Sequence, residues 1–564
     1  MTNSPTPRPA AEIAVTQFRQ ILLWPLLLHK VVDHKKIPAA PDFFDDVTRE
    51  LEKDRKWTWD DRDQPTAKLH GLPWYHAEED YSEVVYFHSF VRDFLYGGDS
   101  TKPKDRPLRV FRRNDVTFYV VTLKSGLAYT LAVERSEFHL FESGVSVLVL
   151  ELKDPQRADG KAIGLNEIMD LQNALRMAFP RRWKDKKPKE CPLQIELKVR
   201  DNPSVIQDYS YAREADFTTI VRAHAELPAA AHLQFLLHPF GIYGPTRAGY
   251  CYQQIEDQRL PSMSYLAVKE PREISEWDFA RLAFFDDAGE SAVGSYSDQY
   301  LADWAKACAY DRFWQRDPSQ PSFGDAKEIA AHNGMMRTRW LCSGYGFVVV
   351  GVDDRADKEP FYTSQIRANF QHHYFRMGLI VHFHRASILG LRDALADATR
   401  LKDEEKRRAL TKVQEGMVAF RSRFWFREVS TQLQGQEIFR WWSDLLGNQE
   451  LFLQVSADVD AAAVLVRTQQ EEIENRTMKK LTRVAAMIGA FGLGLAFLSL
   501  VVAILSWSFF HVGDVEAQWS AAVAGNAGWK LLVVLMGSVL VSGPIGVVLW
   551  KILNKQLNLS DEVR

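Results

Sequence analysis

The sequence predicts a mixed α+β domain that is followed by long helices and by two C-terminal transmembrane helices. Three observations indicate this fold class. Short runs rich in Val, Tyr, Phe and Leu lie between residues 109 and 352, a helical pattern begins near residue 361, and two long uncharged apolar runs follow residue 483. The first pattern predicts strands, the second predicts helices and the third predicts membrane spans.

Length and composition exclude several classes of protein. The 564 residues allow about four domains at roughly 150 residues each. A formal net charge of −3 gives no basic excess, so we expect no nucleic-acid partner. Hydrophobic residues at 46% and charged residues at 25% exclude a disordered chain. The four cysteines form no C-x-x-C pair, which argues against a zinc knuckle or a disulfide framework and favours a reducing compartment.

The α+β domain is expected over residues 13–385, after a loose tail at 1–12. Four runs separated by Gly-containing turns predict an antiparallel meander, at 116–123, 127–133, 138–142 and 145–152. A helix is predicted over 166–177, and further strands are predicted over 193–199, 263–268 and 347–352.

From residue 361 onward the pattern predicts three long helices, with breaks near 401–403 and 446–448. We assign a helical hairpin to 386–446 and a stalk helix to 447–510. The last helix, from about Gln449 through Phe510, would be roughly 93 Å long at about 1.5 Å per residue.

Two apolar runs near the C-terminus predict membrane spans. The first, 484–510, has 27 residues without a charge, and the second, 531–550, has 20 and includes Pro544. A buried helical hairpin of a soluble core is the alternative, but two uncharged runs of this length argue against it. Trp507, Trp529 and Trp550 lie near the span ends, where indole rings prefer the interface.

The charges beside these spans predict the topology. Four basic residues precede the first span, namely Arg476, Lys479, Lys480 and Arg483, and two follow the second, Lys551 and Lys555. The 511–530 loop between the spans has only Lys530. The positive-inside rule therefore places both ends, including the 551–564 tail, in the cytoplasm. The apolar run 21–28 is too short for a signal peptide and contains Pro25. We expect a protein of the inner (cytoplasmic) membrane.

Clusters of polar residues in the soluble part do not define an active site. The four histidines at 372, 373, 382 and 384 lack the i, i+4 spacing of a helical zinc site. The basic run 181–189 could bind a phosphate or a lipid head group, and the acidic runs 353–359 and 403–405 could bind a hard cation, but solvated charges are the simpler interpretation. The chain contains no known catalytic motif, so an enzyme is not indicated.

A stripe of small residues marks the entry into the first span. The steps between its members alternate between three and four residues, which places all of them on one helix face. The members are Asn475, Met478, Thr482, Ala485, Gly489, Gly492, Ala496, Ser499, Ala503 and Ser506. Such a face could line a narrow lumen. It could equally permit close helix packing, for which Ala486, Ala490 and Gly494 form a second set.

The segment Asn475-Arg476-Thr477-Met478-Lys479-Lys480-Leu481-Thr482 resembles the N-x-x-M-x-x-L-T segment of the CorA-type two-span magnesium and divalent cation transporters. The arrangement of a large α+β domain, a stalk helix and a C-terminal hairpin is also similar to that family. The resemblance implies a funnel-shaped homopentamer in which the first span surrounds the ion path. It implies that Asn475, Met478 and Leu481 line the cytoplasmic half of this path, with Gly489 and Gly492 further in.

The chain departs from the family at the outer end of the first span. Ser499-Leu500-Val501 stands where the family has Gly-Met-Asn, the ring credited with holding a hydrated divalent ion. Magnesium is therefore expected as a possible permeant ion that is not strongly selected, and no resident cofactor is expected. Asp514 and Glu516 in the outer loop would concentrate cations at the mouth of an oligomer.

Two functions remain open from the sequence. In the first, the chain is a cation channel or transporter that its large cytoplasmic domain gates in response to an unidentified ligand. In the alternative, the hairpin is an anchor in the lipid bilayer that conducts nothing, and the cytoplasmic domain is a sensor or a stress or defence effector.

Overall fold

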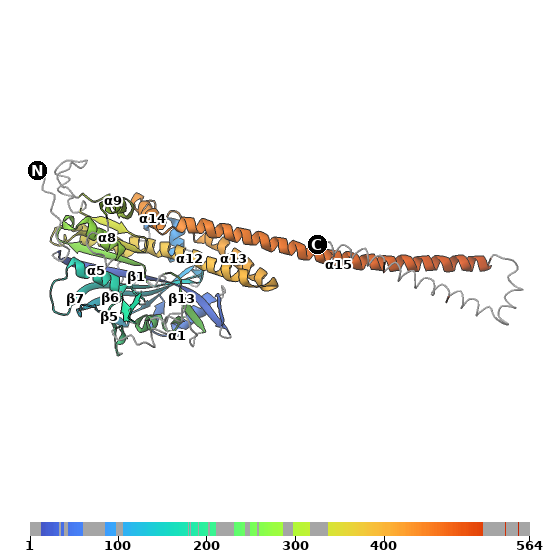
Figure 1. Cartoon of the computed structure of the whole chain (residues 1–564), viewed down its shortest axis with the longest axis horizontal. Coiled ribbons are helices and arrows are strands. Elements are labelled where there is room, and N and C mark those ends of the chain that lie inside the picture. Colours follow the sequence, from blue (N-terminus) through green and yellow to red (C-terminus); the bar gives the residue numbers. More distant parts are fainter. Residues whose placement is uncertain are drawn as a thin grey trace. The chain divides into compact units, whose positions relative to one another are not determined.

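The computed structural model divides the chain into two compact units, Met1–Ala461 and Ala462–Arg564 (Figure 1). The structure describes residues 13–32, 35–38, 43–59, 85–97, 105–178, 180, 182–185, 187–189, 191–200, 203–209, 230–242, 249–256, 259–285, 297–315, 337–510, 536 and 551. The predicted tail at 1–12, the outer loop at 511–530, and most of the second predicted span and the C-terminal tail lie outside these residues.

One large sheet organises the first unit, and its main path runs β11-β10-β5-β6-β7-β1-β14-β17-β16-β15. The strands on this path are β1 (Val15–Val32), β5 (Val116–Thr122), β6 (Ala128–Phe141), β7 (Val145–Arg157), β10 (Gln194–Val199), β11 (Val205–Asp208), β14 (Ser262–Val268), β15 (Ala309–Tyr310), β16 (Arg339–Cys342) and β17 (Gly346–Val352). The strands beside it are β2 (Lys35–Pro38), β3 (Trp57–Trp59), β4 (Leu108–Arg113), β12 (Gly241–Ile242) and β13 (Tyr250–Gln254). A separate hairpin joins β8 (Arg182–Lys184) to β9 (Lys187–Lys189).

The predicted antiparallel meander is confirmed. β5 pairs with β6 and β6 pairs with β7, both antiparallel. The two runs predicted at 127–133 and 138–142 form one strand, β6, because the polar residues between them remain in the ladder, where Arg135 lies opposite Glu151. The strands predicted around 193–199, 263–268 and 347–352 are β10, β14 and β17.

The sequence did not predict the central strand β1. This strand pairs with β7 over nine residues, from Arg19 to Leu27. Proline is normally confined to edge strands because it cannot donate to the ladder. Pro25 is tolerated here because β1 changes partner on its other side, from β14, which pairs as far as Leu22, to β13, which pairs from Leu26.

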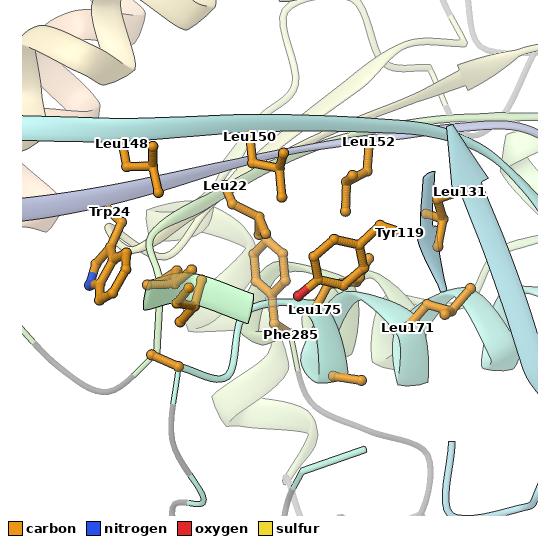
Figure 2. Packing of buried hydrophobic residues seen from close by; sticks show 14 of the residues in the cluster. Leu22, Trp24, Tyr119, Leu131, Leu148, Leu150, Leu152, Leu171, Leu175 and Phe285 are labelled. Atoms are coloured by element: carbon orange, nitrogen blue, oxygen red, sulfur yellow. The ribbon is translucent and has the colours of Figure 1, made fainter. Parts of the chain in front are cut away.

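Two apolar cores cover the two faces of the sheet. Side chains of a strand alternate between faces, and on β7 Leu148, Leu150 and Leu152 belong to one core while Val147 and Val149 belong to the other. Figure 2 shows the first core, in which these leucines face side chains of the helix that spans 165–175. The unit is therefore a helix–sheet–helix sandwich.

The helices divide between these two cores. The first core contains residues of α1 (Phe43–Lys53), α5 (Leu165–Leu175), α7 (Ala231–Leu237), α8 (Glu276–Phe284) and α9 (Asp298–Cys308). The second contains residues of α4 (Ser89–Tyr96), η4 (Phe361–Ile366), η5 (Phe370–Tyr374), α12 (Phe375–Arg400), α13 (Asp403–Arg423), α14 (Leu433–Leu445) and the first turns of α15 (Asn448–Phe510). Two short helices, η3 (Pro271–Glu273) and α11 (Arg367–Asn369), complete the set within the described residues.

The prediction of three long helices after residue 361 was wrong, because four follow the short segments η4, α11 and η5. The chain leaves helical conformation between α13 and α14, where Phe424, Phe426 and Val429 turn into the second core. Ser430 holds this connection by donating its hydroxyl to the backbone oxygen of Tyr86, at 2.5 Å. The predicted hairpin 386–446 thus contains the end of α12, all of α13 and α14.

Candidate functional site

The predicted path residues all lie on α15, a single helix of 63 residues. They are Asn475, Met478, Leu481, Thr482, Ala485, Gly489, Gly492, Ala496 and Ser499, and every one of them is exposed in the single chain. The helix is long and apolar enough to cross a membrane, with a mean hydropathy of 2.5 in its most apolar window. Large apolar side chains are exposed there too, including Leu493 at 75%.

The stripe exposes backbone and mostly small side chains instead of large ones. A Cβ atom added at Gly489 or Gly492 would meet no atom within 4 Å among the described residues. The hydroxyls of Thr482 and Ser499 donate to the backbone oxygens of Met478 and Leu495, at 2.8 and 2.9 Å. These hydroxyls are therefore satisfied as donors within the helix, while their oxygens can still accept a further hydrogen bond.

The second set of small residues lies on another part of the helix. Ala490 is half-buried, and so are Leu498 and Val501, whereas the stripe residues are exposed. Gly494 is exposed, and a Cβ atom added there would also meet nothing within 4 Å among the described residues. The stripe and the second set therefore occupy different faces of α15.

The acidic residues predicted at the outer mouth, Asp514 and Glu516, lie outside the described residues, as does the second predicted span except for Met536. Just before the apolar segment of α15, Lys479 and Lys480 are exposed and Arg483 is half-buried. Arg476 lies 3.9 Å from Glu472 one turn earlier. Exposed pairs of this kind contribute little to stability.

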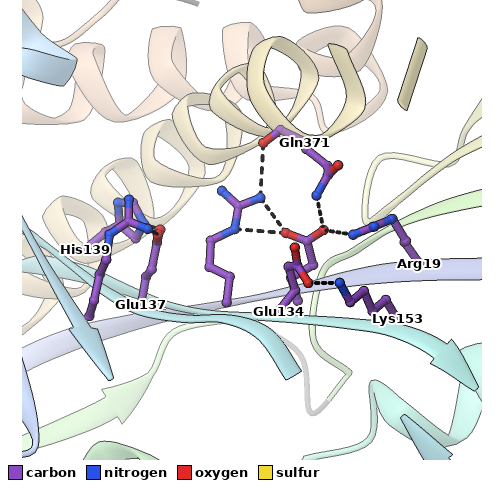
Figure 3. Close-up of polar contacts among 9 residues, drawn as sticks. Arg19, Glu134, Glu137, His139, Lys153 and Gln371 are labelled. Atoms are coloured by element: carbon purple, nitrogen blue, oxygen red, sulfur yellow. Dashed lines mark hydrogen bonds and ion pairs between the residues drawn. The ribbon is translucent and has the colours of Figure 1, made fainter. Parts of the chain in front are cut away.

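The sequence missed a buried network of charges between the sheet and the start of α12 (Figure 3). Glu151 on β7 accepts hydrogen bonds from Arg19 on β1 at 3.1 Å and from Arg135 on β6 at 2.6 and 3.0 Å. The Gln371 amide also donates to it, at 2.9 Å. Arg135 in turn donates to the Gln371 backbone oxygen at 3.1 Å, so the network joins three strands to η5.

A second buried carboxylate, Glu137, lies further along β6. It pairs with Arg112 at 3.1 Å and with His139 at 2.9 Å. Burial would raise the pKa of Glu137, but Arg112 and the neighbouring His139 and Arg135 outweigh burial and hold the pKa well below its ordinary value. Both carboxylates are only 1% exposed, so their oxygens serve the fold and are not accessible to a substrate.

The other polar clusters have structural partners. His373 lies 3.1 Å from the Asn369 amide oxygen and stacks on Tyr86, while His382 and His384 are wholly buried. Asp354 accepts hydrogen bonds from the backbone of Phe361, Tyr362 and Thr363. Among the residues that the structure describes, no group of three or more His, Cys, Asp or Glu side chains could hold a metal ion.

The signal for the buried network was present in the sequence. Glu151 follows the strand pattern of 145–152 at a position that alternation assigns to the same face as Val147 and Val149. A charge at an inward position of an apolar strand requires a partner.

The chain matches no known family model, no curated protein and no solved structure.

Proposed function

We propose that this protein is a homo-oligomeric cation channel or transporter of the cytoplasmic membrane, most simply a pentamer, in which α15 lines the ion path. This proposal rests mainly on one observation: α15 combines an apolar segment that has no buried residue with a continuous stripe of mostly small residues. Both features lie on one unbroken helix whose first turns are packed into the second core.

The exposed apolar surface supports membrane insertion. None of the most apolar window of α15 is buried in the single chain. Burial of apolar surface is worth about 25 cal/mol per Å², so this surface would be costly in water. A bilayer, further helices of the same protein, or both would remove it from water.

The spacing of the stripe supports an assembly of several α15 helices. A repeat of 3.5 residues drifts by about 20° per heptad on a straight helix, hence by about 70° between Asn475 and Ser499. A left-handed bundle removes this drift by supercoiling. One or two spans cannot enclose a path, so the lumen requires copies of the chain around it.

Selectivity and gating follow from the same arrangement. The resemblance to CorA-type transporters favours a funnel with five first spans inside and five second spans outside, with both termini in the cytoplasm. Without the Gly-Met-Asn ring, magnesium would pass without strong selection. The α+β domain would gate the path by binding an unidentified signal more tightly in one state than in the other.

Flux through liposomes tests this proposal. Gly492→Trp places a bulky ring on the stripe and is expected to reduce magnesium and sodium flux by at least tenfold. Phe497→Trp is the matched control, because Phe497 already exposes a ring and lies about 140° further around the helix at about 100° per residue. The control is expected to retain flux, and native mass measurement should show the same pentamer for the wild-type chain, Gly492→Trp and Phe497→Trp. Gly494→Trp tests the second set of small residues, where close packing predicts a loss of assembly.

Each other outcome has a defined meaning. Wild-type liposomes without flux under any ionic gradient would favour the membrane-anchored sensor or effector. Loss of flux and of assembly in Gly494→Trp, with Gly492→Trp unaffected, would show that the stripe faces lipid and the second set faces the bundle. A monomer or dimer under gentle extraction would eliminate the enclosed path.

A further inference from the structure

The connection between α14 and α15 is held to α12 by two polar contacts with the backbone. The Asn448 amide donates to the backbone oxygen of Val381 at 3.0 Å, and Arg385 donates to the backbone oxygen of Leu446 at 2.6 Å. Gly447 lies between these contacts with φ 66°, a left-handed conformation that ends α14 and starts α15. The joint is therefore short and closely defined.

His382 lies inside this joint. It follows Val381 directly, is wholly buried and contacts the rings of Trp442 on α14 and Tyr345 between β16 and β17. Neither of its ring nitrogens forms a hydrogen bond with a residue that the structure describes. The charged groups that face it are Glu256, at 3.8 Å, and Arg385 on its own helix.

His384 lies on another side of the same helix and is also wholly buried. Its Nε2 donates to the Phe424 backbone oxygen at 2.6 Å, which fixes the proton on that nitrogen. The other nitrogen, Nδ1, has no hydrogen-bond partner among the described residues. The rings around it are apolar and come from α13, α14 and the segment between them: Phe420, Trp425, Phe426 and Phe439. No charged side chain is placed to balance a second proton on this ring within the described residues.

We propose that this joint is a proton-sensitive latch: acidification of the cytoplasm releases the layer formed by α13, α14 and the start of α15 from α12. The latch consists of His382, His384 and the two backbone contacts that adjoin them. His384 fits the docked layer only when neutral, because no charged side chain among the described residues faces it. At His382, burial and Arg385 oppose a second proton and outweigh Glu256, which lies 3.8 Å away. A released layer leaves both rings in water, where either can take up a proton.

The direction of the effect follows from linkage. Burial and the nearby Arg385 lower the pKa of His382 to about 3. Burial lowers the pKa of His384 to about 4, although its hydrogen bond to Phe424 opposes this. The released state has ordinary values near 6.5. The docked layer is therefore fully stable above about pH 6.5 and loses stability as the pH falls toward the pKa values of the docked state. Between pH 7.5 and 5.5 the docking equilibrium constant falls by about tenfold per histidine.

Hydrogen–deuterium exchange on the full chain in lipid nanodiscs tests the latch. Exchange protection of the peptide that covers the end of α14 and the start of α15 is expected to fall about 100-fold between pH 7.5 and 5.5, after correction for intrinsic rates. Protection in α5 should not change. His384→Gln, which retains an N–H donor, should reduce the fall to about tenfold, and His382→Gln with His384→Gln should abolish it.

His232→Gln is the matched control, because His232 is equally buried but lies on α7 in the other core. This variant should show the wild-type fall at the joint. The proposal is overturned if α15 and α5 respond equally to pH, or if the double variant retains the wild-type fall. If the α13–α14 layer of the double variant is already released at pH 7.5, the single variant still tests the proposal. His384→Gln should then show an about tenfold fall in exchange protection at the joint between pH 7.5 and 5.5, and a fall of about 100-fold would contradict the latch.

A second measurement rests on the proposed function. If α15 lines an ion path, flux should change with internal pH in the wild-type protein and lose this dependence in the double variant. A latch that responds to pH in a protein without flux would support this inference and contradict the proposed channel. Flux that is independent of pH while the exchange behaves as expected would show that release does not gate the path.

Discussion

At the residue scale, Glu151 concentrates several interactions in one side chain. Its two oxygens receive hydrogen bonds from β1, β6 and η5, and the guanidinium of Arg135 also lies over the Phe375 ring at 4.2 Å. Because the group is buried, its interactions are not screened by water. One carboxylate thus fixes the position of the start of α12 on the sheet.

Replacing Glu151 with Gln is expected to lower the free energy of unfolding by about 3–5 kcal/mol, because two arginines would lose their buried counter-charge. Glu134→Gln is the control, since Glu134 on β6 pairs with Lys153 on β7 and both side chains are partly exposed, and it should cost less than about 1 kcal/mol. Urea unfolding of the detergent-solubilised full chain measures both. Equal effects would contradict the role given to Glu151.

The same carboxylate predicts an acid dependence. Burial would raise the pKa of Glu151 above its ordinary value of 4.5, but Arg135, Arg19 and the hydrogen bonds from Arg135 and Gln371 outweigh burial and lower the pKa. Its contribution is therefore complete above about pH 4.5 and is lost as the pH falls through the lowered value. In Glu151→Gln, unfolding should depend less on pH in this acid range than in the wild type.

At the element scale, the short π-helical segment η4 depends on one side chain from the preceding loop. Asp354 is buried and accepts from three consecutive backbone N–H groups, at distances of 2.7 to 2.9 Å. The first N–H groups of a helix have no partner within the helix. Asp354 therefore satisfies donors that would otherwise be buried without an acceptor.

Asp354→Ala is expected to destabilise the fold by about 2–4 kcal/mol and to increase amide exchange at 361–363, because each buried donor left unsatisfied costs about 1–3 kcal/mol. Its neighbour supplies the control. Asp353 pairs with the exposed Arg355, so Asp353→Ala should cost less than about 1 kcal/mol and leave η4 protected. Unchanged exchange in Asp354→Ala would show that η4 forms without this cap.

Element prediction succeeded where one pattern dominated and failed where tertiary contacts decided. The meander followed from apolar runs and Gly-containing turns. β1 was missed because Pro25 argues against a central strand, and only the change of partner from β14 to β13 makes it acceptable. The separation of α13 from α14 was missed because Phe424 and Phe426 fit a helix pattern, although they pack beside Phe94 in the second core.

At the scale of the whole molecule, the alternating spacing of three and four residues predicted that the proposed path residues share one helix face. The structure places all of them on α15. The pattern alone could not predict what the face contacts, because the partners of an exposed apolar helix are not encoded in the spacing of its own residues. Strand alternation in the sequence indicates that Glu151 faces inward, but neither its partners nor the latch could be predicted, since strands and helices far apart in the chain supply them.

In the proposed channel, the whole assembly would also determine which ion passes. Asp514 and Glu516 would be repeated five times at the outer mouth of a pentamer and would attract cations. At the inner end, Lys479 and Lys480 would repel cations if they faced the path. At about 100° per residue, Lys480 lies about 160° from Thr482 and would point away from the stripe toward lipid phosphates, whereas Lys479 lies about 60° from Thr482 and borders the stripe.

We therefore expect weak discrimination among cations, with magnesium permitted, and exclusion of chloride. In planar bilayers under a tenfold NaCl gradient, the reversal potential should approach the cation limit of about 59 mV, and replacing Na⁺ with Mg²⁺ should shift it only modestly. Lys480→Gln should leave the potential unchanged, whereas Asp514→Asn with Glu516→Gln should move it toward zero, most clearly at low salt because screening is weak there. A current carried mainly by chloride, or a lysine variant that becomes more cation-selective, would place the basic residues on the lumen side of α15.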